Sequence, residues 1–225
     1  MKTKEEIAIL HTYENQDWVF IVLVLIVGLV GAVRAMFPSQ FRLMWRMLSL
    51  KNYAENFFAL DAKKSNTFSL ILQSVALLTG GLLIHLLLPN EVLNEVHPVN
   101  RYILIVLGLS FFSILKSGIG MAIGWLIEMP HIIERYQLLK KLHYHLISVL
   151  IIPPVALGAY AVPNREFWLV ASAAIASILL VSGTLRSAWQ MNSELKLYYV
   201  YVFLYFCALE IAPIALIAST VLNSQ

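Results

Sequence analysis

The chain has 225 residues, of which 60% are hydrophobic and 13% charged, with a net charge of +3 and a mean hydropathy of +0.76. A soluble domain carries about twice this share of charged residues, so the composition excludes an ordinary soluble domain. The small net charge gives no reason to expect a nucleic-acid partner. Apolar runs of about 20 residues are typical of transmembrane helices. The sequence therefore predicts an all-α polytopic membrane protein, one membrane domain over residues 1–225. The six predicted spans are residues 18–36, 67–88, 102–127, 142–162, 167–185 and 197–221.

The distribution of Lys and Arg predicts the orientation of these spans, because basic residues gather in cytoplasmic loops. Eleven basic residues fall on one side of the predicted spans: Arg34, Arg42, Arg46, Lys51, Lys63, Lys64, Arg135, Lys140, Lys141, Arg186 and Lys196. Four fall on the other side: Lys2, Lys4, Arg101 and Arg165. Both termini are therefore predicted to lie outside the cytoplasm.

A basic amphipathic helix is predicted at about residues 39–60, between the first two spans. Its apolar positions recur at intervals of three and four residues, which places them on one helical face: Phe41, Met44, Trp45 and Leu48. Arg42 and Arg46 fall on another face. Such a helix lies at the headgroup level and attracts anionic lipid, so Arg42, Arg46 and Trp45 are predicted headgroup contacts. The helix is either a surface anchor or a site for regulation or partner binding.

The third span carries a charge inside an apolar run. Lys116 lies on the same helical face as Ser113 and Gly120, and Gly120 and Gly124 form a G-x-x-x-G pair. Small residues let two membrane helices approach closely. Lys116 is therefore expected to face protein rather than lipid.

Prolines interrupt two of the later spans. Pro153 and Pro154 stand in the fourth span, and Pro213 follows Glu210 in the sixth. A proline removes the hydrogen bond to the carbonyl four residues earlier, which for Pro213 is the carbonyl of Leu209. A freed carbonyl beside a carboxylate makes a polar site that a proton, cation or water can use. The alternative interpretation of each proline is a static kink in its helix.

Lys116 and Glu210 are predicted to form an intramembrane pair. At ~1.5 Å per residue they lie about 16 and 20 Å from the inner ends of their helices, which are compatible depths near the midplane. A charged side chain within a membrane span costs free energy to insert, so it usually pairs with another group or takes part in function. The pair is either structural or a proton- or ion-linked site. The remaining alternative is that the two residues have separate partners.

No catalytic residue, metal site or cofactor is predicted. The chain lacks the H-E-x-x-H, G-x-S-x-G and G-x-x-x-x-G-K-[ST] patterns, which mark metalloproteases, serine hydrolases and P-loop proteins. His143 and His145 are two residues apart, so they point to different faces of a helix. Cys207 is the single cysteine, and a buried apolar role is expected for it.

The run LYFCALEIAPIALI resembles the closing signature of the domain-of-unknown-function 4271 family of Bacteroidota inner-membrane proteins. The run FSILKSGIGMAIGWLIE resembles the third-helix pattern of the same family. The resemblance maps the family's intramembrane acid onto Glu210 and its lysine onto Lys116. The resemblance implies a fold and a compartment, the bacterial inner membrane, but no activity. In that compartment the two predicted outer termini would lie in the periplasm.

Three function classes remain open. The first is a transport or envelope-machine component that uses the Lys116–Glu210 site. The second is a non-catalytic subunit of a larger membrane complex, or a homo-oligomer. The third is a small lipid-acting enzyme. Membrane lipids, including anionic headgroups, are expected partners in each.

The predicted orientation can be tested with single cysteines in a Cys207→Ser background. Ser39 follows the first span and Ser224 the sixth, so a membrane-impermeant thiol reagent added outside the membrane should label a cysteine at Ser224 and not one at Ser39. The reverse pattern would show that the orientation is wrong.

Overall fold

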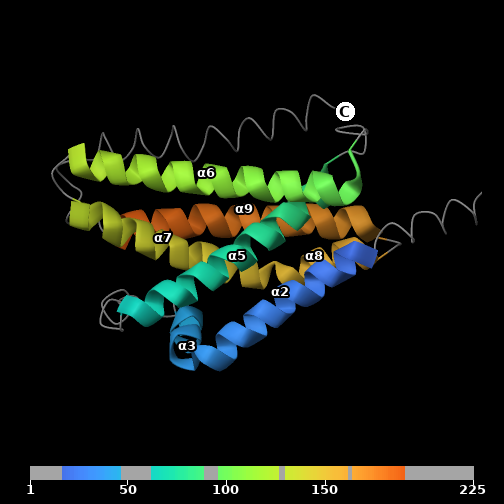
Figure 1. The fold of residues 1–225 in the computed structure, drawn as a ribbon, viewed down its shortest axis with the longest axis horizontal. Helices are drawn as coiled ribbons and strands as arrows, with labels where there is room; N and C mark the ends of the chain where they lie inside the picture. Colours follow the sequence, from blue (N-terminus) through green and yellow to red (C-terminus); the bar gives the residue numbers. More distant parts are fainter. Residues whose placement is uncertain (1–16, 47–61, 89–95, 127–129, 162–163, 191–225) are drawn as a thin grey trace, which may run out of the picture.

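A computed structural model describes residues 17–46, 62–88, 96–126, 130–161 and 164–190, which are almost entirely helical (Figure 1). An α-helix satisfies its backbone hydrogen bonds within one segment, which is the requirement that an apolar bilayer imposes. The helices are α2 (Asp17–Met36), α3 (Pro38–Arg46), α5 (Ala62–Leu87), α6 (Pro98–Leu126), α7 (Pro130–Leu150), α8 (Ile152–Tyr160) and α9 (Arg165–Gln190).

Five helical stretches in the described part are long and apolar enough to cross a membrane: Asp17–Met36, Asn66–Leu87, Pro98–Ala122, Lys140–Tyr160 and Arg165–Thr184. They correspond to the first five predicted spans, so the all-α class and these five apolar helices are confirmed. The sixth predicted span, residues 197–221, lies outside the described residues.

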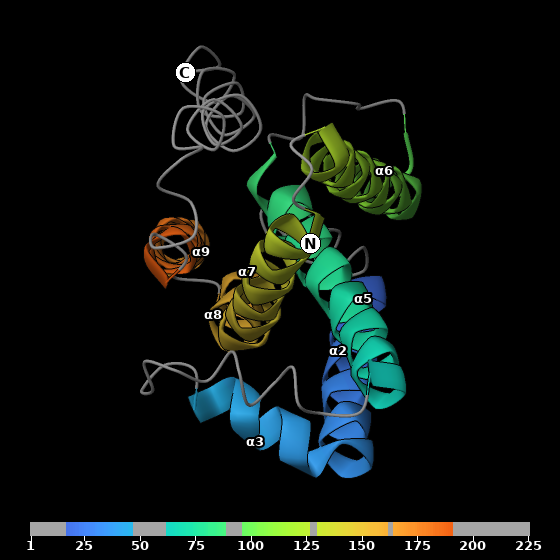
Figure 2. The ribbon, with the colours of Figure 1, turned by 90° about the vertical axis from the view of Figure 1, so that its left-hand side faces the viewer.

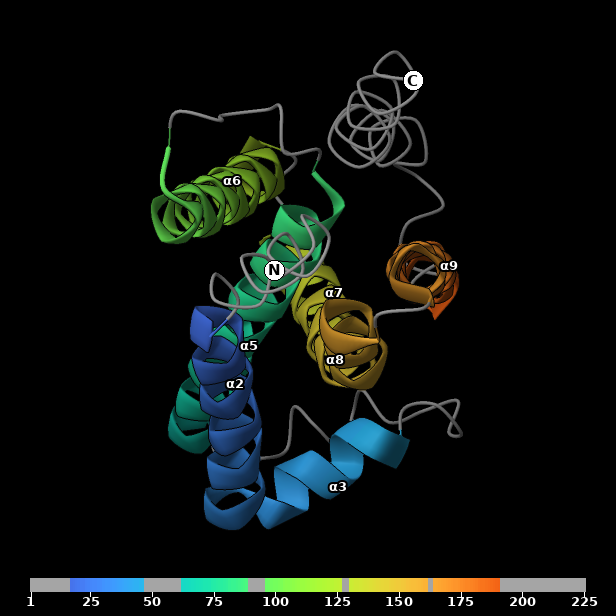
Figure 3. The ribbon, with the colours of Figure 1, turned by 90° about the vertical axis from the view of Figure 1, so that its right-hand side faces the viewer.

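Helices α5 and α7 hold the arrangement together. α5 contacts α2, α6, α7, α8 and α9, and α7 contacts α3, α5, α6, α8 and α9. In the two end-on views α6 and α9 lie on either side of α7, with α3 beneath it (Figures 2 and 3). The outer helices are therefore positioned through the two central ones.

One side of α5 is buried along most of its length. The buried residues follow one another at alternating steps of four and three, which is the spacing of a helix-packing seam. All five have no exposed surface: Phe68, Leu72, Val75, Thr79 and Leu82. This seam is the apolar contact surface that α5 presents to its neighbours.

An aromatic cluster joins α2, α5 and α6 at the end of the molecule where α2 begins. The Trp18 ring lies 5.1 Å from the His85 ring and 5.3 Å from the Tyr102 ring, between centroids. The Tyr102 hydroxyl also donates a hydrogen bond to the Leu78 carbonyl, at 3.2 Å. Trp and Tyr prefer the membrane–water boundary, so this cluster suits an end of the spans.

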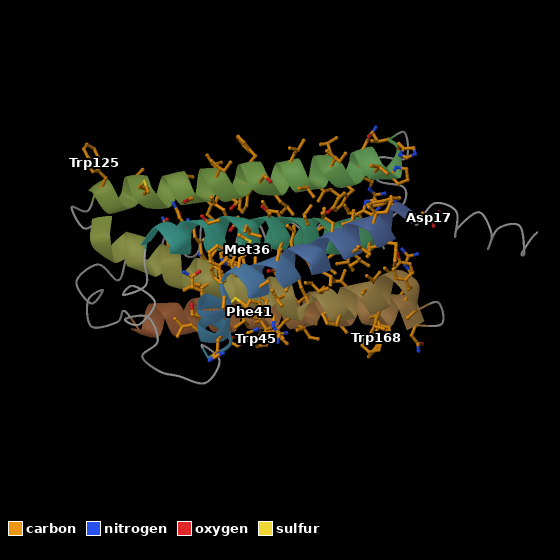
Figure 4. All side chains as sticks on the ribbon, turned by 60° about the horizontal axis from the view of Figure 1, so that its bottom comes forward. Asp17, Met36, Phe41, Trp45, Trp125 and Trp168 are labelled. Carbon is orange, nitrogen blue, oxygen red and sulfur yellow. The ribbon has the colours of Figure 1, made fainter. Side chains whose placement is uncertain are left out.

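The connector helix α3 differs in part from its prediction. Met44, expected in the lipid surface, has no exposed area, because α3 packs against α2 and α7. Trp45 stays 38% exposed and Arg42 is exposed, and Figure 4 shows the labelled Trp45 and Phe41 on this helix. Residues 47–61 lie outside the described part. The membrane-surface role of residues 39–60 therefore stays a prediction.

The Pro153–Pro154 pair stands at the break between α7 and α8. Ile151 is a turn residue with φ −85° and ψ −7°, and its N–H still donates to the Ile147 carbonyl at 3.0 Å. Ile151 and Val155 are buried in the apolar core. The described surroundings of this break are thus largely apolar, and its use as a polar site stays a prediction.

Gly81 allows α5 and α6 to approach closely. A Cβ at this position would lie 2.6 Å from Val106 Cγ2 and 3.4 Å from Tyr102 Cε2. Val106 is β-branched, so its methyl group cannot swing away freely. Any side chain at residue 81 would push the two helices apart.

Gly81→Ala should therefore destabilise the protein by about 1–3 kcal/mol, the usual cost of overpacking. Gly28→Ala is the matched control, because nothing lies within 4 Å of a Cβ there. Thermal unfolding in detergent should show a lower midpoint for Gly81→Ala only. Equal midpoints for the two variants would contradict the close approach.

Candidate functional site

Polar side chains join α5, α6 and α7 where they pack together. The Gln73 amide donates to Ser113 Oγ at 3.1 Å, which links α5 to α6. The Gln137 amide reaches the Ser117 carbonyl at 3.5 Å, which links α7 to α6. Hydrogen bonds of this kind hold membrane helices together, at about 0.6–2 kcal/mol each. We call these four residues the polar seam.

Lys116 lies next to the polar seam and faces α7. Its Nζ is 5.9 Å from the centre of the Tyr144 ring, and Lys140 Nζ is 5.9 Å from the same ring. Both distances are within the range of a cation–π contact, about 6 Å. Both amino groups therefore lie beside one aromatic ring. We call Lys116, Lys140 and Tyr144 the lysine cluster.

The lysine cluster is withdrawn from solvent. Lys140 is 5% exposed, while Lys116 is half-buried. Lys116 stands six residues before Ala122, the end of its apolar stretch, a distance of about 9 Å along the helix. Lys140 is the first residue of the next apolar stretch. The lysine cluster thus lies close to the end of the spans at which α6 is followed by α7. The sequence predicts Lys116 nearer to the midplane of the membrane.

Lys140 and Tyr144 are not among the site residues predicted from the sequence. The predicted fourth span begins at residue 142, which assigns Lys140 to the basic loop before it. Helix α7 instead begins at Pro130, so Lys140 is ten residues inside a helix. The four-residue spacing of Lys140 and Tyr144 was the available signal, since such residues share a helical face.

The described acids lie far from this cluster. Among the side chains that the structure describes, the acidic ones are Asp17 and Glu166, and both are exposed. Figure 4 places Asp17 at the opposite end from Trp125, the end of α6 near which the lysine cluster lies. Glu210, the predicted partner of Lys116, lies outside the described residues.

The other predicted site residues are spread over the molecule. Arg42 and Trp45 are on α3, away from the lysine cluster, and the Arg46 side chain is outside the described part. Leu209 and Pro213 are also outside it. Within the described ranges, no three His, Cys, Asp or Glu side chains are grouped to hold a metal ion.

The ring of Tyr144 can be tested separately from its hydroxyl group. Tyr144→Leu removes the ring from both lysines and should cost about 0.5–2 kcal/mol of stability, the size of a cation–π interaction. Tyr144→Phe keeps the ring and should cost less. Thermal unfolding of both variants in detergent measures the difference, and equal losses would show that the ring does not stabilise the lysines.

The comparisons with known proteins identify a family and no activity. No curated protein and no solved structure matches this chain. A family model described as "Domain of unknown function (DUF4271)" matches residues 19–221, which include both Lys116 and Glu210. Because the match covers nearly all of the 225 residues, the chain belongs to the DUF4271 family.

Proposed function

We propose that this DUF4271 protein is a transport or envelope-machine component of the bacterial inner membrane, with both termini in the periplasm. Its working site is Lys116 together with Glu210. Support comes from the five apolar helices long enough to span a membrane and from the excess of basic residues on one side of them.

The observation that carries the proposal is the position of Lys116. The residue stands within the apolar stretch Pro98–Ala122, yet its amino group turns to α7 and the Tyr144 ring. Ionisable groups inside spans are expensive to insert and usually mark ion pathways, relays or pairs. Lys140, the second lysine beside the same ring, raises the free-energy cost of insertion further, because like charges repel.

Glu210 is the acid that suits this cluster. It is the one acidic residue within the apolar run of residues 197–221. Helix α9 ends at Gln190, on the side where α7 begins (Figure 1). By the rise of an α-helix, Glu210 stands about 20 Å from the start of the predicted span 197–221. Opposite charges in low dielectric attract strongly.

A second function is favoured by the outer surface of α6. Residues at alternating steps of four and three are all exposed there: Leu104, Gly108, Phe111, Leu115, Gly118, Ala122 and Trp125. A Cβ at Gly108 or Gly118 would meet nothing within 4 Å. Regularly spaced small residues suit helix packing in membranes. In a larger complex or a homo-oligomer, this face of α6 would pack against a helix of the partner. In a monomer, lipid would cover it.

Lipid contact at the connector belongs to the same proposal. Arg42 is exposed and Trp45 is 38% exposed on α3. A cationic side chain beside an indole ring suits an anionic headgroup at the membrane surface. Arg46 is proposed to act with them.

The Lys116–Glu210 site predicts a specific pattern of mutant effects. Lys116→Met and Glu210→Gln should each cost roughly 3–5 kcal/mol, because removing one partner leaves the other charge uncompensated. The double variant should recover part of the loss. Thermal unfolding in detergent measures stability, and growth of a strain that depends on the plasmid-borne gene measures function.

The double variant also separates the two roles of the site. Recovery of both stability and growth supports a structural pair, as in an assembly subunit. Recovery of stability without growth supports a proton- or ion-linked site. Stability losses that simply add would mean that Lys116 and Glu210 do not interact, and the proposed site would be wrong.

A further inference from the structure

We propose that a buried water molecule binds between α3 and α7, where it bridges the imidazole ring of His145 and the side-chain carbonyl of Gln40. The proposal goes beyond the function proposed above and does not involve the Lys116–Glu210 site. It rests on two buried polar side chains, one on each helix, whose hydrogen-bonding atoms are unused.

His145 is the more demanding of the two side chains. It has no exposed surface, and neither Nδ1 nor Nε2 has a hydrogen-bond partner in the described part of the chain. An imidazole carries an N–H on at least one nitrogen in both its neutral and its charged form. Buried polar groups are nearly always hydrogen-bonded to protein or to ordered water. The ring therefore needs an acceptor in a place that bulk water does not reach.

The polar groups one helical turn from His145 on α7 do not serve as this acceptor. The Ser148 hydroxyl donates to the main-chain carbonyl of His145 at 2.7 Å and makes no bond with its ring. Lys141 is exposed, and a lysine ammonium only donates. The acceptor for the imidazole N–H must therefore come from outside α7.

The direction in which His145 points follows from its two predecessors in the chain. His143 lies against α9, because a Cβ at Gly183 would be 3.1 Å from its Cδ2. Tyr144 lies towards α6, where Lys116 Nζ is 5.9 Å from its ring centre. Successive residues are about 100° apart around a helix, so His145 points a further step round, away from α9 and α6. Besides α8, which continues α7, the helices that α7 meets on this remaining side are α3 and α5 (Figures 2 and 3).

Helix α3 brings the second unused group to this side of α7. Gln40 and Met44 are four residues apart and share one face of α3, and both are buried. Oε1 of Gln40 has no hydrogen-bond partner among the described residues. Arg42 and Trp45, elsewhere on the same helix, are exposed. The buried face of α3, which contacts α7, therefore supplies a carbonyl acceptor opposite an imidazole donor.

Water has the hydrogen-bonding capacity that these two groups require. They make no direct hydrogen bond with each other, so the molecule that links them must accept from an N–H and donate to a carbonyl. Buried waters typically join buried polar groups that lack other partners. A hard metal cation prefers several oxygen ligands, carboxylates among them, and the described acids, Asp17 and Glu166, are both exposed.

The depth of the site suits a water molecule. His145 stands five residues after Lys140, the first residue of its apolar stretch, which is about 8 Å along the helix. Water can therefore reach it from the nearby end of the spans. The bridge gives α3 a polar anchor on α7 in addition to the apolar contact of Met44.

Solid-state nuclear magnetic resonance of the full chain in lipid bilayers tests the proposal. The protein is labelled with ¹⁵N-histidine, the His145 signals are assigned by sequential correlation, and magnetisation transfer from water protons to the ring nitrogens is recorded. The wild type should show transfer from a bound water to a ring nitrogen of His145. Absence of this transfer, or a ring bonded directly to a protein group, would overturn the proposal.

Two matched glutamine variants test the other end of the bridge. Gln40→Leu removes the carbonyl acceptor, so the transfer to His145 should be lost. Gln73→Leu is the control, because Gln73 bonds directly to Ser113 and its loss should leave the transfer unchanged. Unchanged transfer in Gln40→Leu, or equal loss in both variants, would contradict the bridge.

A metal ion at the same place gives a different result. His145 signals that change when a chelator is added to the wild type would show a metal ligand in place of water and overturn the proposal. The wild-type measurements need no variant, so they decide the matter even if Gln40→Leu does not fold.

Discussion

The buried seam along α5 is the contact on which the rest of the arrangement depends. Phe68, Leu72, Val75 and Leu82 have no exposed surface, and they fix the helix that touches α2, α6, α7, α8 and α9. Apolar burial gives no net drive between helices in lipid, because the lipid tails are equally apolar. Close packing must supply the attraction, and this explains why Gly81 brings α6 so near to α5.

The lysine cluster is a consequence of that packing. Once α5 holds α6 and α7 together, the sides of α6 and α7 that meet carry Lys116 and Lys140. The same contact allows the Gln73–Ser113 hydrogen bond, so neutral polar groups lie around the charged ones. A polar site inside an apolar helix bundle needs such partners, since an isolated charge in hydrocarbon is costly.

The helices also differ in how much of them other helices cover. In the apolar stretch of α7 and α8, 56% of the residues are buried, against 6% in that of α6. Helix α6 therefore carries the lysine on one side and a nearly uncovered apolar surface on the other. A helix of this kind can serve an internal polar site and an outer contact at the same time, which is why the proposed functions draw on different sides of one element.

The sequence alone determined the class of the protein and the positions of its apolar helices, because a 20-residue apolar run is a local property that the bilayer selects. It also determined that Lys116 lies within one of them. It did not predict that Lys140 belongs to a helix or that it meets Lys116 at Tyr144. Where one helix faces another depends on packing between residues far apart in the chain, such as Gly81 with Val106. Only the tertiary structure could therefore bring Lys116 and Lys140, on different helices, to one aromatic ring.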